Sequence, residues 1–212
     1  MKILAIRGKN LASIEEAFEI DFREEPLRSA GIFAITGNTG SGKSTLLDAL
    51  CLALFDDTPR TYGASENISV EDVPGRRLNQ RDCRTILRRG AGSGYAKADF
   101  VALSGIPYRS RWQVRRAYER PDGALQNTEI RLYNLDTGTE EQGTKTELLA
   151  TVSRLIGLTF EQFTRAVLLA QGDFAAFLKA RQIEKAELLE KLTGTEIYSR
   201  ISVKIYEYFK EA

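Results

Sequence analysis

The sequence predicts an α/β fold of the P-loop nucleoside-triphosphatase type. Residues Gly37 to Thr45 read GNTGSGKST, which fits the phosphate-binding pattern G-x-x-x-x-G-K-[ST]. An apolar run at 31–35 precedes this motif, and a second apolar run at 46–55 follows it. Such a motif needs a strand that enters the loop and a helix that leaves it, and both patterns are present. The alternative is a glycine-rich turn that contains Lys-Ser by chance.

Several short elements are expected around the motif. Residues 2–6 are mostly apolar, and residues 18–22 alternate apolar and acidic side chains, so both read as strands. Residues 31–36 should form a strand that is buried on both faces. Residues 46–55 should form a helix that packs within the protein, because its apolar side chains cover most of its circumference.

A long polar connection is expected from Pro59 to about Gly94, because Pro and Gly residues punctuate it. Connections of this length often carry function. Three antiparallel strands should follow, over residues 95–103, 108–118 and 128–135. The middle strand places aromatic and apolar side chains on one face and arginines on the other. The prediction is therefore a mixed or antiparallel sheet around the P-loop helix.

The last third of the chain has a helical pattern. Two capping boxes begin helices that should end near residues 156 and 170, formed by Thr144 with Glu147 and by Thr159 with Gln162. Apolar side chains recur at spacings of three and four over residues 198–208, which fits the start of a coiled coil or a single amphipathic helix. The predicted organisation is one lobe over residues 1–195 and the start of a coiled coil over residues 196–212.

The composition excludes several kinds of chemistry. The 212 residues include no histidine, which excludes imidazole catalysis and imidazole metal ligation within this chain. The two cysteines, Cys51 and Cys83, form neither a disulfide framework nor a C-x-x-C metal site. No stretch approaches 18 uninterrupted apolar residues, and the N-terminus lacks the apolar core of a secretion signal. A cytoplasmic location without membrane contact is expected.

The net charge of +1 conceals a basic middle third. Residues 60–120 contain 13 Lys or Arg and 6 Asp or Glu, a net charge of +7. A face of this kind suits a polyanion such as DNA, although a solvated basic face without a ligand fits the charge equally well. The candidate contacts to DNA phosphates are Arg88, Arg89, Arg109, Arg111 and Arg115.

Each residue type in the motif has a role in binding phosphate. Glycines allow consecutive N–H groups to turn inward and form a nest for phosphate oxygens. Lys43 would reach the β- and γ-phosphates of ATP, and the Ser44 hydroxyl would join the coordination shell of Mg²⁺. The N-terminus of the following helix adds its positive dipole end. The candidate ATP-binding residues are Gly37, Asn38, Thr39, Gly40, Ser41, Gly42, Lys43, Ser44 and Thr45.

The order of these pieces resembles the N-terminal part of the SbcC family of exonuclease subunits. This family belongs to the ABC-type ATPases related to the structural-maintenance-of-chromosomes (SMC) and double-strand-break-repair ATPases. The matching stretches span nearly the whole chain, and they read MKILAIRGKNLASI, FAITGNTGSGKSTLLDALCLALFDDTPR, LLAQGDFAAFLKA and AELLEKLTGTEIYSRI. The third stretch selects this family among P-loop proteins.

The resemblance implies roles for residues outside the motif. Gln171 would be a catalytic residue beside Lys43, because the family's glutamine at this place reaches Mg²⁺ and the attacking water. From the residues alone, Gln171 could equally be a polar cap or a hinge. Arg7 and Asn10 would lie near the nucleotide, with ordinary strand-end residues as the alternative. The segment 181–194 would relay the nucleotide state to a second lobe.

The resemblance also implies that parts of the ATPase come from elsewhere. No Walker B acidic pair, signature motif or switch histidine is found in this sequence. The implied partners are a C-terminal lobe of the same protein, an SbcD-type nuclease subunit, DNA, and a second copy in a head-to-head dimer formed on ATP binding. The complete protein would couple ATP hydrolysis to the processing of DNA ends or hairpins in repair and recombination. This chain alone should bind nucleotide without turning it over.

Two other functions use a P-loop. A small-molecule kinase could employ the arginines between residues 76 and 89 as a lid, but the predicted antiparallel strands do not fit the alternating strands and helices of kinases. A nucleotide-gated binding module without catalysis is the second alternative.

Overall fold

The structure, a computed structural model, describes residues 1–62, 68–168, 204 and 210. Contacts divide the chain into two units, Met1–Ile156 and Gly157–Ala212, which are described separately. The predicted boundary at residues 195 and 196, the segment 181–194 and Gln171 lie outside the described residues, as does the coiled-coil segment apart from residues 204 and 210.

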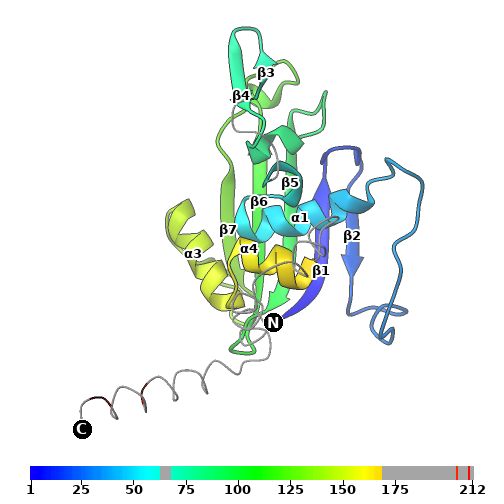
Figure 1. Ribbon diagram of the computed structural model, residues 1–212, viewed down its shortest axis with the longest axis vertical. Helices are drawn as coiled ribbons and strands as arrows, with labels where there is room; N and C mark the ends of the chain where they lie inside the picture. Colours follow the sequence, from blue (N-terminus) through cyan, green and yellow to red (C-terminus); the bar gives the residue numbers. More distant parts are fainter. Residues whose placement is uncertain (63–67, 169–203, 205–209, 211–212) are drawn as a thin grey trace. The chain divides into compact units, whose positions relative to one another are not determined.

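A five-stranded antiparallel sheet forms the centre of the first unit, in the order β2-β1-β5-β6-β7 (Figure 1). Its strands are β1 (Lys2–Lys9), β2 (Phe18–Asp21), β5 (Ser93–Val101), β6 (Pro107–Arg115) and β7 (Glu129–Asn134). The register pairs Ala98 with Ile6 on one side and with Ser110 on the other, so these three side chains share a face. The predicted strands at both ends of this region are confirmed.

Helix α1 (Lys43–Phe55) lies across one face of the sheet (Figure 1). Ser110 donates a hydrogen bond of 2.5 Å to the carbonyl of Ala53, and Trp112 Nε1 donates one of 2.6 Å to Asp56, the residue that ends the helix. Residues 48–54 are all buried. A helix that is apolar around its circumference must be enclosed, and the predicted buried helix is confirmed.

The predicted connection between Pro59 and Gly94 contains regular structure, so its interpretation as one long loop is wrong. It holds the helical turns α2 (Pro59–Tyr62) and η1 (Cys83–Ile86) and the hairpin β3 (Ser69–Val73) and β4 (Arg76–Asn79). Pro74 and Gly75 close this hairpin, and Gly75 has a φ of 79°. The Asp72 carboxylate accepts hydrogen bonds from Arg116 (2.8 Å) and from the Leu125 N–H (2.9 Å). The hairpin is thus tied to the ends of the main sheet.

The prediction of a buried strand over residues 31–36 is also wrong. These residues belong to no strand, and Ile32, Phe33 and Ile35 are 94%, 46% and 46% exposed. An apolar run becomes a buried strand only when neighbouring strands pair with its N–H and C=O groups. Within the described residues, the sheet ends at β2, and no strand lies beside this segment.

Both predicted capping boxes are present. In the first unit, the Thr144 N–H donates to Glu147 Oε2 at 2.7 Å, and helix α3 (Lys145–Ile156) follows and packs against β7. A short helical turn, η2 (Ala117–Glu119), connects β6 toward β7. In the second unit, the capping box of Thr159 and Gln162 begins α4 (Phe160–Phe163), which continues into the π-helical turn η3 (Thr164–Leu168). The predicted end of that helix near residue 170 lies outside the described residues.

Candidate nucleotide-binding site

The P-loop joins the exposed segment 31–36 to the start of α1. Gly40 and Gly42 have φ values of 84° and 94°, in the left-handed region that glycine enters without a Cβ penalty. Gly42 is the N-cap of α1, and no side chain caps this helix end. The first N–H groups of α1 therefore have no partner within the helix, which is the arrangement that binds anions.

Lys43 occupies the loop that it belongs to. Its Nζ donates hydrogen bonds to the carbonyl oxygens of Gly37 (2.6 Å) and Asn38 (2.8 Å). Ser44, in the first turn of α1, is exposed, whereas Thr45 is only 2% exposed. An ammonium group and a hydroxyl thus lie together at the open N-terminus of α1, and the predicted motif forms one local site.

Arg60 of α2 supports this helix end from the side. Its Nε and Nη2 donate to Asp48 Oδ2 at 3.0 and 2.6 Å, and its Nη2 approaches the Thr45 hydroxyl at 3.4 Å. Burial raises the pKa of Asp48 above its ordinary value, and the Arg60 charge opposes that rise. The sequence analysis missed Arg60 and Asp48, because a pair 12 residues apart produces no local motif.

The loop after β1 lies against the P-loop. A Cβ placed on Gly42 would lie 2.7 Å from Ile14 Cγ1 and 3.4 Å from Ser13 Oγ. Asn10 belongs to the same loop, where its Nδ2 donates to the Ser93 carbonyl at 2.7 Å. The structure therefore brings the loop that contains Asn10 to the phosphate-binding motif.

Arg7 lies elsewhere. It pairs with Lys97 in the strand register, on the face of the sheet turned away from α1. Its guanidinium donates to Glu19 at 2.7 Å and to Asp99 at 2.9 Å. These contacts occupy the Arg7 side chain within the sheet, so the structure does not bring it together with the P-loop residues.

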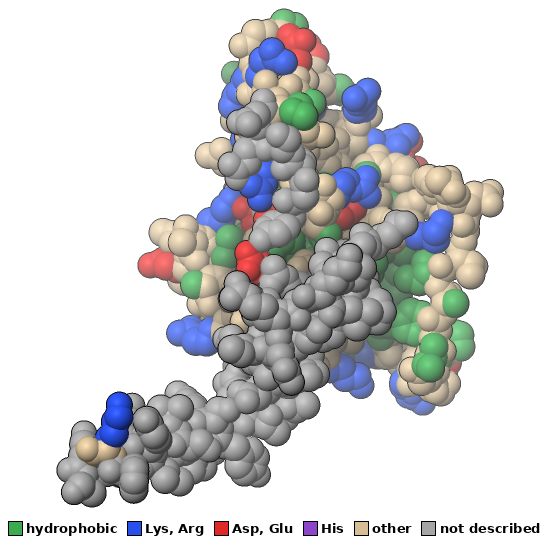
Figure 2. Space-filling view, viewed as in Figure 1, with side chains coloured by type: hydrophobic (Ala, Val, Ile, Leu, Met, Phe, Trp, Pro, Cys, Tyr) green, Lys and Arg blue, Asp and Glu red, His purple; other side chains and the backbone are tan. Residues whose placement is uncertain are grey.

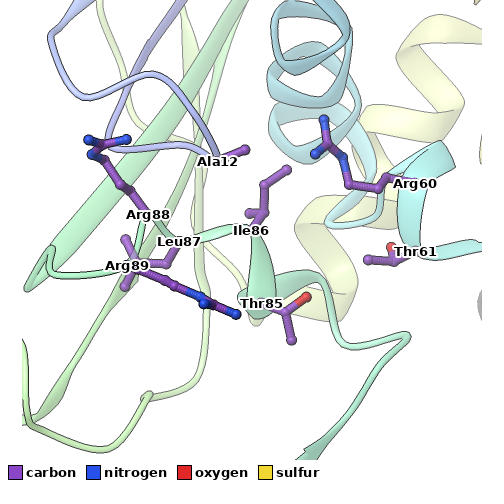
Figure 3. A pocket seen from close by; sticks show the side chains of 8 residues that line it. All are labelled: Ala12, Arg60, Thr61, Thr85, Ile86, Leu87, Arg88 and Arg89. Carbon is purple, nitrogen blue, oxygen red and sulfur yellow. The ribbon is translucent and has the colours of Figure 1, made fainter. Parts of the chain in front are cut away.

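A cavity of about 430 Å³ borders the P-loop region (Figure 3). Its side chains come from the loop after β1, from α2 and from the segment that follows η1, and they are Ala12, Arg60, Thr61, Thr85, Ile86, Leu87, Arg88 and Arg89. Three guanidinium groups and two hydroxyls in a space of this size suit a small polar ligand with anionic groups.

The basic face of the sheet is partly neutralised. Of the predicted DNA contacts, Arg109 is bound to Asp99, Arg111 donates to Gln113 at 2.7 Å, and Arg115 is exposed. The pKa of Lys97 is lowered by burial and by the neighbouring charges, of which Arg111 is the largest contributor. That shift indicates a positive potential on this face. Figure 2 shows further Lys and Arg side chains around the β3–β4 hairpin.

Arg88 and Arg89 lie apart from the three sheet arginines, in the segment after η1. Arg88 donates to Glu15 Oε2 at 2.8 Å, and Arg89 is exposed. The five predicted DNA contacts therefore do not form one cluster, and their role remains a prediction.

Searches of the described residues for two other kinds of site gave negative results. No group of three or more His, Cys, Asp or Glu side chains could hold a metal ion there. Nor does that part of the chain contain a helix of the length and apolar character needed to span a membrane.

Comparison with known proteins identifies the domain. The AAA domain family matches residues 5–211. The chain belongs to this family. As an AAA domain it is 52% identical to the SbcC subunit of nuclease SbcCD from Pseudomonas aeruginosa, over 100% of this chain and 18% of that protein. It is 46% identical to the SbcC subunit of the same nuclease from Rhodobacter capsulatus, over 98% of this chain and 17% of that protein.

A third relative of this AAA domain carries a different name. The probable DNA double-strand break repair Rad50 ATPase of Aquifex aeolicus is 30% identical, over 99% of this chain and 18% of that protein. The chain therefore spans less than a fifth of each of these relatives. The predicted α/β P-loop ATPase fold and the resemblance to the SbcC family are confirmed.

Proposed function

We propose that this chain is the ATP-binding lobe of an SMC-like ATPase that couples ATP binding and hydrolysis to DNA end or hairpin processing in repair and recombination. One observation carries the proposal: Lys43 and Ser44 lie at an uncapped helix N-terminus within a glycine-rich loop. The names of the relatives, a nuclease subunit and a double-strand break repair ATPase, support the DNA-repair setting.

The P-loop residues have a direct role in this proposal. The N–H groups of residues 37–45 and the start of α1 would bind the triphosphate of ATP. Lys43 would exchange its bonds to the Gly37 and Asn38 carbonyls for bonds to the β- and γ-phosphates, where it stabilises negative charge. Thr45 would contribute its backbone, because its side chain is buried against Arg60.

The residues present also fit a magnesium ion. Mg²⁺ takes oxygen ligands, and the exposed Ser44 hydroxyl is one, in the first turn of α1 beside Lys43. Ser44 would hold the ion together with Gln171, whose role rests on the family resemblance. When bound, Mg²⁺ would neutralise charge that develops on the β- and γ-phosphates.

The base and ribose of ATP would lie in the cavity beside the loop. Ala12 precedes Ser13, which borders Gly42, and Arg60 approaches Thr45, so the cavity adjoins the phosphate site from two directions. Asn10, in the same loop as Ala12, would keep the loop in place through its bond to the Ser93 carbonyl.

A second lobe would complete the catalytic site. The apolar segment before the P-loop is exposed, and Figure 2 shows hydrophobic side chains gathered over the stretch between β2 and α1. Exposed apolar patches mark surfaces that another partner covers. The C-terminal lobe of the same protein would pair with this segment and supply the base that activates water. Two such heads would bind two ATP molecules between them.

The remaining partners follow from the same proposal. An SbcD-type nuclease subunit would bind the complete protein, and DNA would contact the basic sheet face and the arginines after η1. The location would be cytoplasmic.

An ATPase assay on this chain and on the complete protein tests the proposal. We expect this chain alone to bind ATP with Mg²⁺ weakly and to release no phosphate, and the complete protein to hydrolyse ATP in a manner stimulated by DNA. Lys43→Ala should abolish both activities, whereas Arg28→Ala, a change in an exposed ion pair with Glu25, should alter neither. Continued inactivity of the complete protein would instead favour a binding module without catalysis.

A further inference from the structure

Arg88 holds the loop after β1 in place by three contacts. Its backbone N–H donates to the Asn10 carbonyl at 3.0 Å, its Nη1 donates to the Ser13 carbonyl at 3.2 Å, and its Nη2 donates to Glu15 Oε2 at 2.8 Å. In Figure 3 the Arg88 side chain is directed away from Arg60. Arg88 thus binds both ends of the short stretch that contains Ile14.

The stretch held by Arg88 is the one that touches the P-loop. Ile14 and Ser13 fill the space that a side chain at Gly42 would need. Asn10 and Ala12 have φ values of 55° and 45°, which non-glycine residues adopt at a cost. Such conformations persist only where the surrounding contacts enforce them. The shape of this loop therefore depends on what holds it.

We propose that Arg88 is a positioning residue for ATP binding. By fixing Ser13 and Glu15 it keeps Ile14 against Gly42, and so keeps the P-loop backbone and the first turn of α1 in the form that receives the triphosphate. This inference rests on the proposed function of the same site. It assigns Arg88 to the ATPase site, although its sequence context predicted a contact to DNA.

The fold does not depend on the Arg88 side chain. The Ala12 N–H donates to the Ile86 carbonyl at 2.7 Å, and Leu11 and Leu87 form a bridge and are buried. These backbone and apolar contacts remain when the Arg88 guanidinium is removed. A variant at this position should consequently fold and show its defect in nucleotide binding.

Glu15 separates positioning from a direct contact. It does not line the cavity beside the P-loop, and its carboxylate binds the Arg88 guanidinium. If Arg88 simply attracted phosphate, removal of the Glu15 charge would free its guanidinium and strengthen nucleotide or DNA binding. If Arg88 positions the loop, removal of Glu15 weakens nucleotide binding.

The test measures steady-state ATP hydrolysis by the full-length protein with Mg²⁺ and without DNA. We expect Arg88→Ala to raise the KM for ATP about three- to tenfold and Glu15→Ala about two- to fivefold, the range that a partly exposed ion pair allows. The kcat should stay within about twofold, because an interaction made equally in the ground and transition states affects KM alone. Arg88→Lys should recover part of the affinity.

Arg120→Ala is the matched control. Arg120 also lies in the basic middle third in an exposed ion pair, with Asp122 at 3.2 Å, but it belongs to the end of η2. Its KM should equal that of the wild type. An unchanged or lowered KM in Glu15→Ala overturns the inference, even if Arg88→Ala melts at a lower temperature. Absence of hydrolysis by the wild type overturns the proposed function itself.

Discussion

Arg109 on β6 donates two hydrogen bonds to the carboxylate of Asp99 on β5, from Nε at 2.6 Å and from Nη2 at 2.8 Å. The Asp99 side chain is fully buried, and it accepts a third bond from Arg7. The charge of Arg109 is therefore balanced within the sheet. Of the three arginines predicted to line a cationic face, only Arg111 and Arg115 leave their charge unopposed by a carboxylate among the described residues.

The Asp99 carboxylate should stabilise the fold in a pH-dependent manner. Burial favours the neutral form, but the hydrogen bonds from Arg109 and Arg7 outweigh it and hold the pKa of Asp99 below its ordinary value. Because the folded-state pKa is depressed, this stabilisation is present above the unfolded-state pKa and is lost as pH falls through the folded-state pKa. Asp99→Asn should lower the free energy of unfolding at pH 7 by about 2 kcal/mol.

Urea denaturation of this chain at pH 7 and at about pH 3 checks the prediction, because the Asp99→Asn deficit should shrink at the lower pH. Glu19→Gln is the control, since Glu19 also pairs with Arg7 but is 55% exposed. An exposed pair contributes at most about 1 kcal/mol. Equal losses in the two variants would contradict the special position of Asp99.

DNA binding, if it uses this face, should depend on Arg111 and Arg115. The double variant Arg111→Ala, Arg115→Ala should weaken DNA binding by the full-length protein to the same extent for different sequences, because phosphate contacts carry no sequence information. Each lost contact should reduce the slope of log affinity against log salt by about 0.9. Titrations at several salt concentrations measure this slope. An unchanged slope, with Arg120→Ala as control, would locate the DNA site elsewhere.

Elements with local signals were predictable from the sequence, and elements that depend on distant partners were not. The P-loop, the capping boxes and the alternating strands are fixed by neighbours within a few residues, and all are present. The run 31–36 has the apolar content of a buried strand, but burial needs a neighbouring strand that the described residues do not provide. The hairpin 69–79 was missed because its strands, SVEDV and RRLN, are short and polar.

The side chains that support the site were also beyond sequence reasoning. Arg60 meets Asp48 across a helix end, and Arg88 meets Glu15 across 73 residues. Arginines of this basic region look alike in the sequence, and only the fold shows which of them pair with a carboxylate. Charge counting therefore indicated a basic surface correctly but assigned the wrong number of free cations to it.

Removal of Arg60 should destabilise the chain more at neutral than at acidic pH. Asp48 is 3% exposed, and burial already raises its pKa. A carboxyl group with a raised folded-state pKa reduces stability as pH rises above the unfolded-state value, and loss of Arg60 enlarges that effect. Arg60→Ala should lose about 1–3 kcal/mol at pH 7 and less near pH 4.

Denaturation curves at the two pH values test this dependence. Asp48→Asn added to Arg60→Ala should restore much of the loss, because no charge is then buried without a partner. A loss that is the same at both pH values would show that Arg60 acts through packing alone.

Gly42→Ala should impair both stability and ATP binding through two separable effects. The φ of 94° costs an alanine about 1 kcal/mol, and the new methyl group would lie 2.7 Å from Ile14 Cγ1, closer than real contacts allow. The clash must move either the loop after β1 or the start of α1, so the affinity for ATP should fall at least about tenfold. Gly75→Ala provides the control, because Gly75 has a φ of 79° with no heavy atom of the described residues within 4 Å of the new methyl group. It should lose stability without loss of ATP affinity. Ile14→Ala combined with Gly42→Ala should recover ATP affinity but retain the backbone cost, as measured by nucleotide titration and thermal melting. Failure of Ile14→Ala to recover any affinity would show that the P-loop does not depend on its contact with this loop.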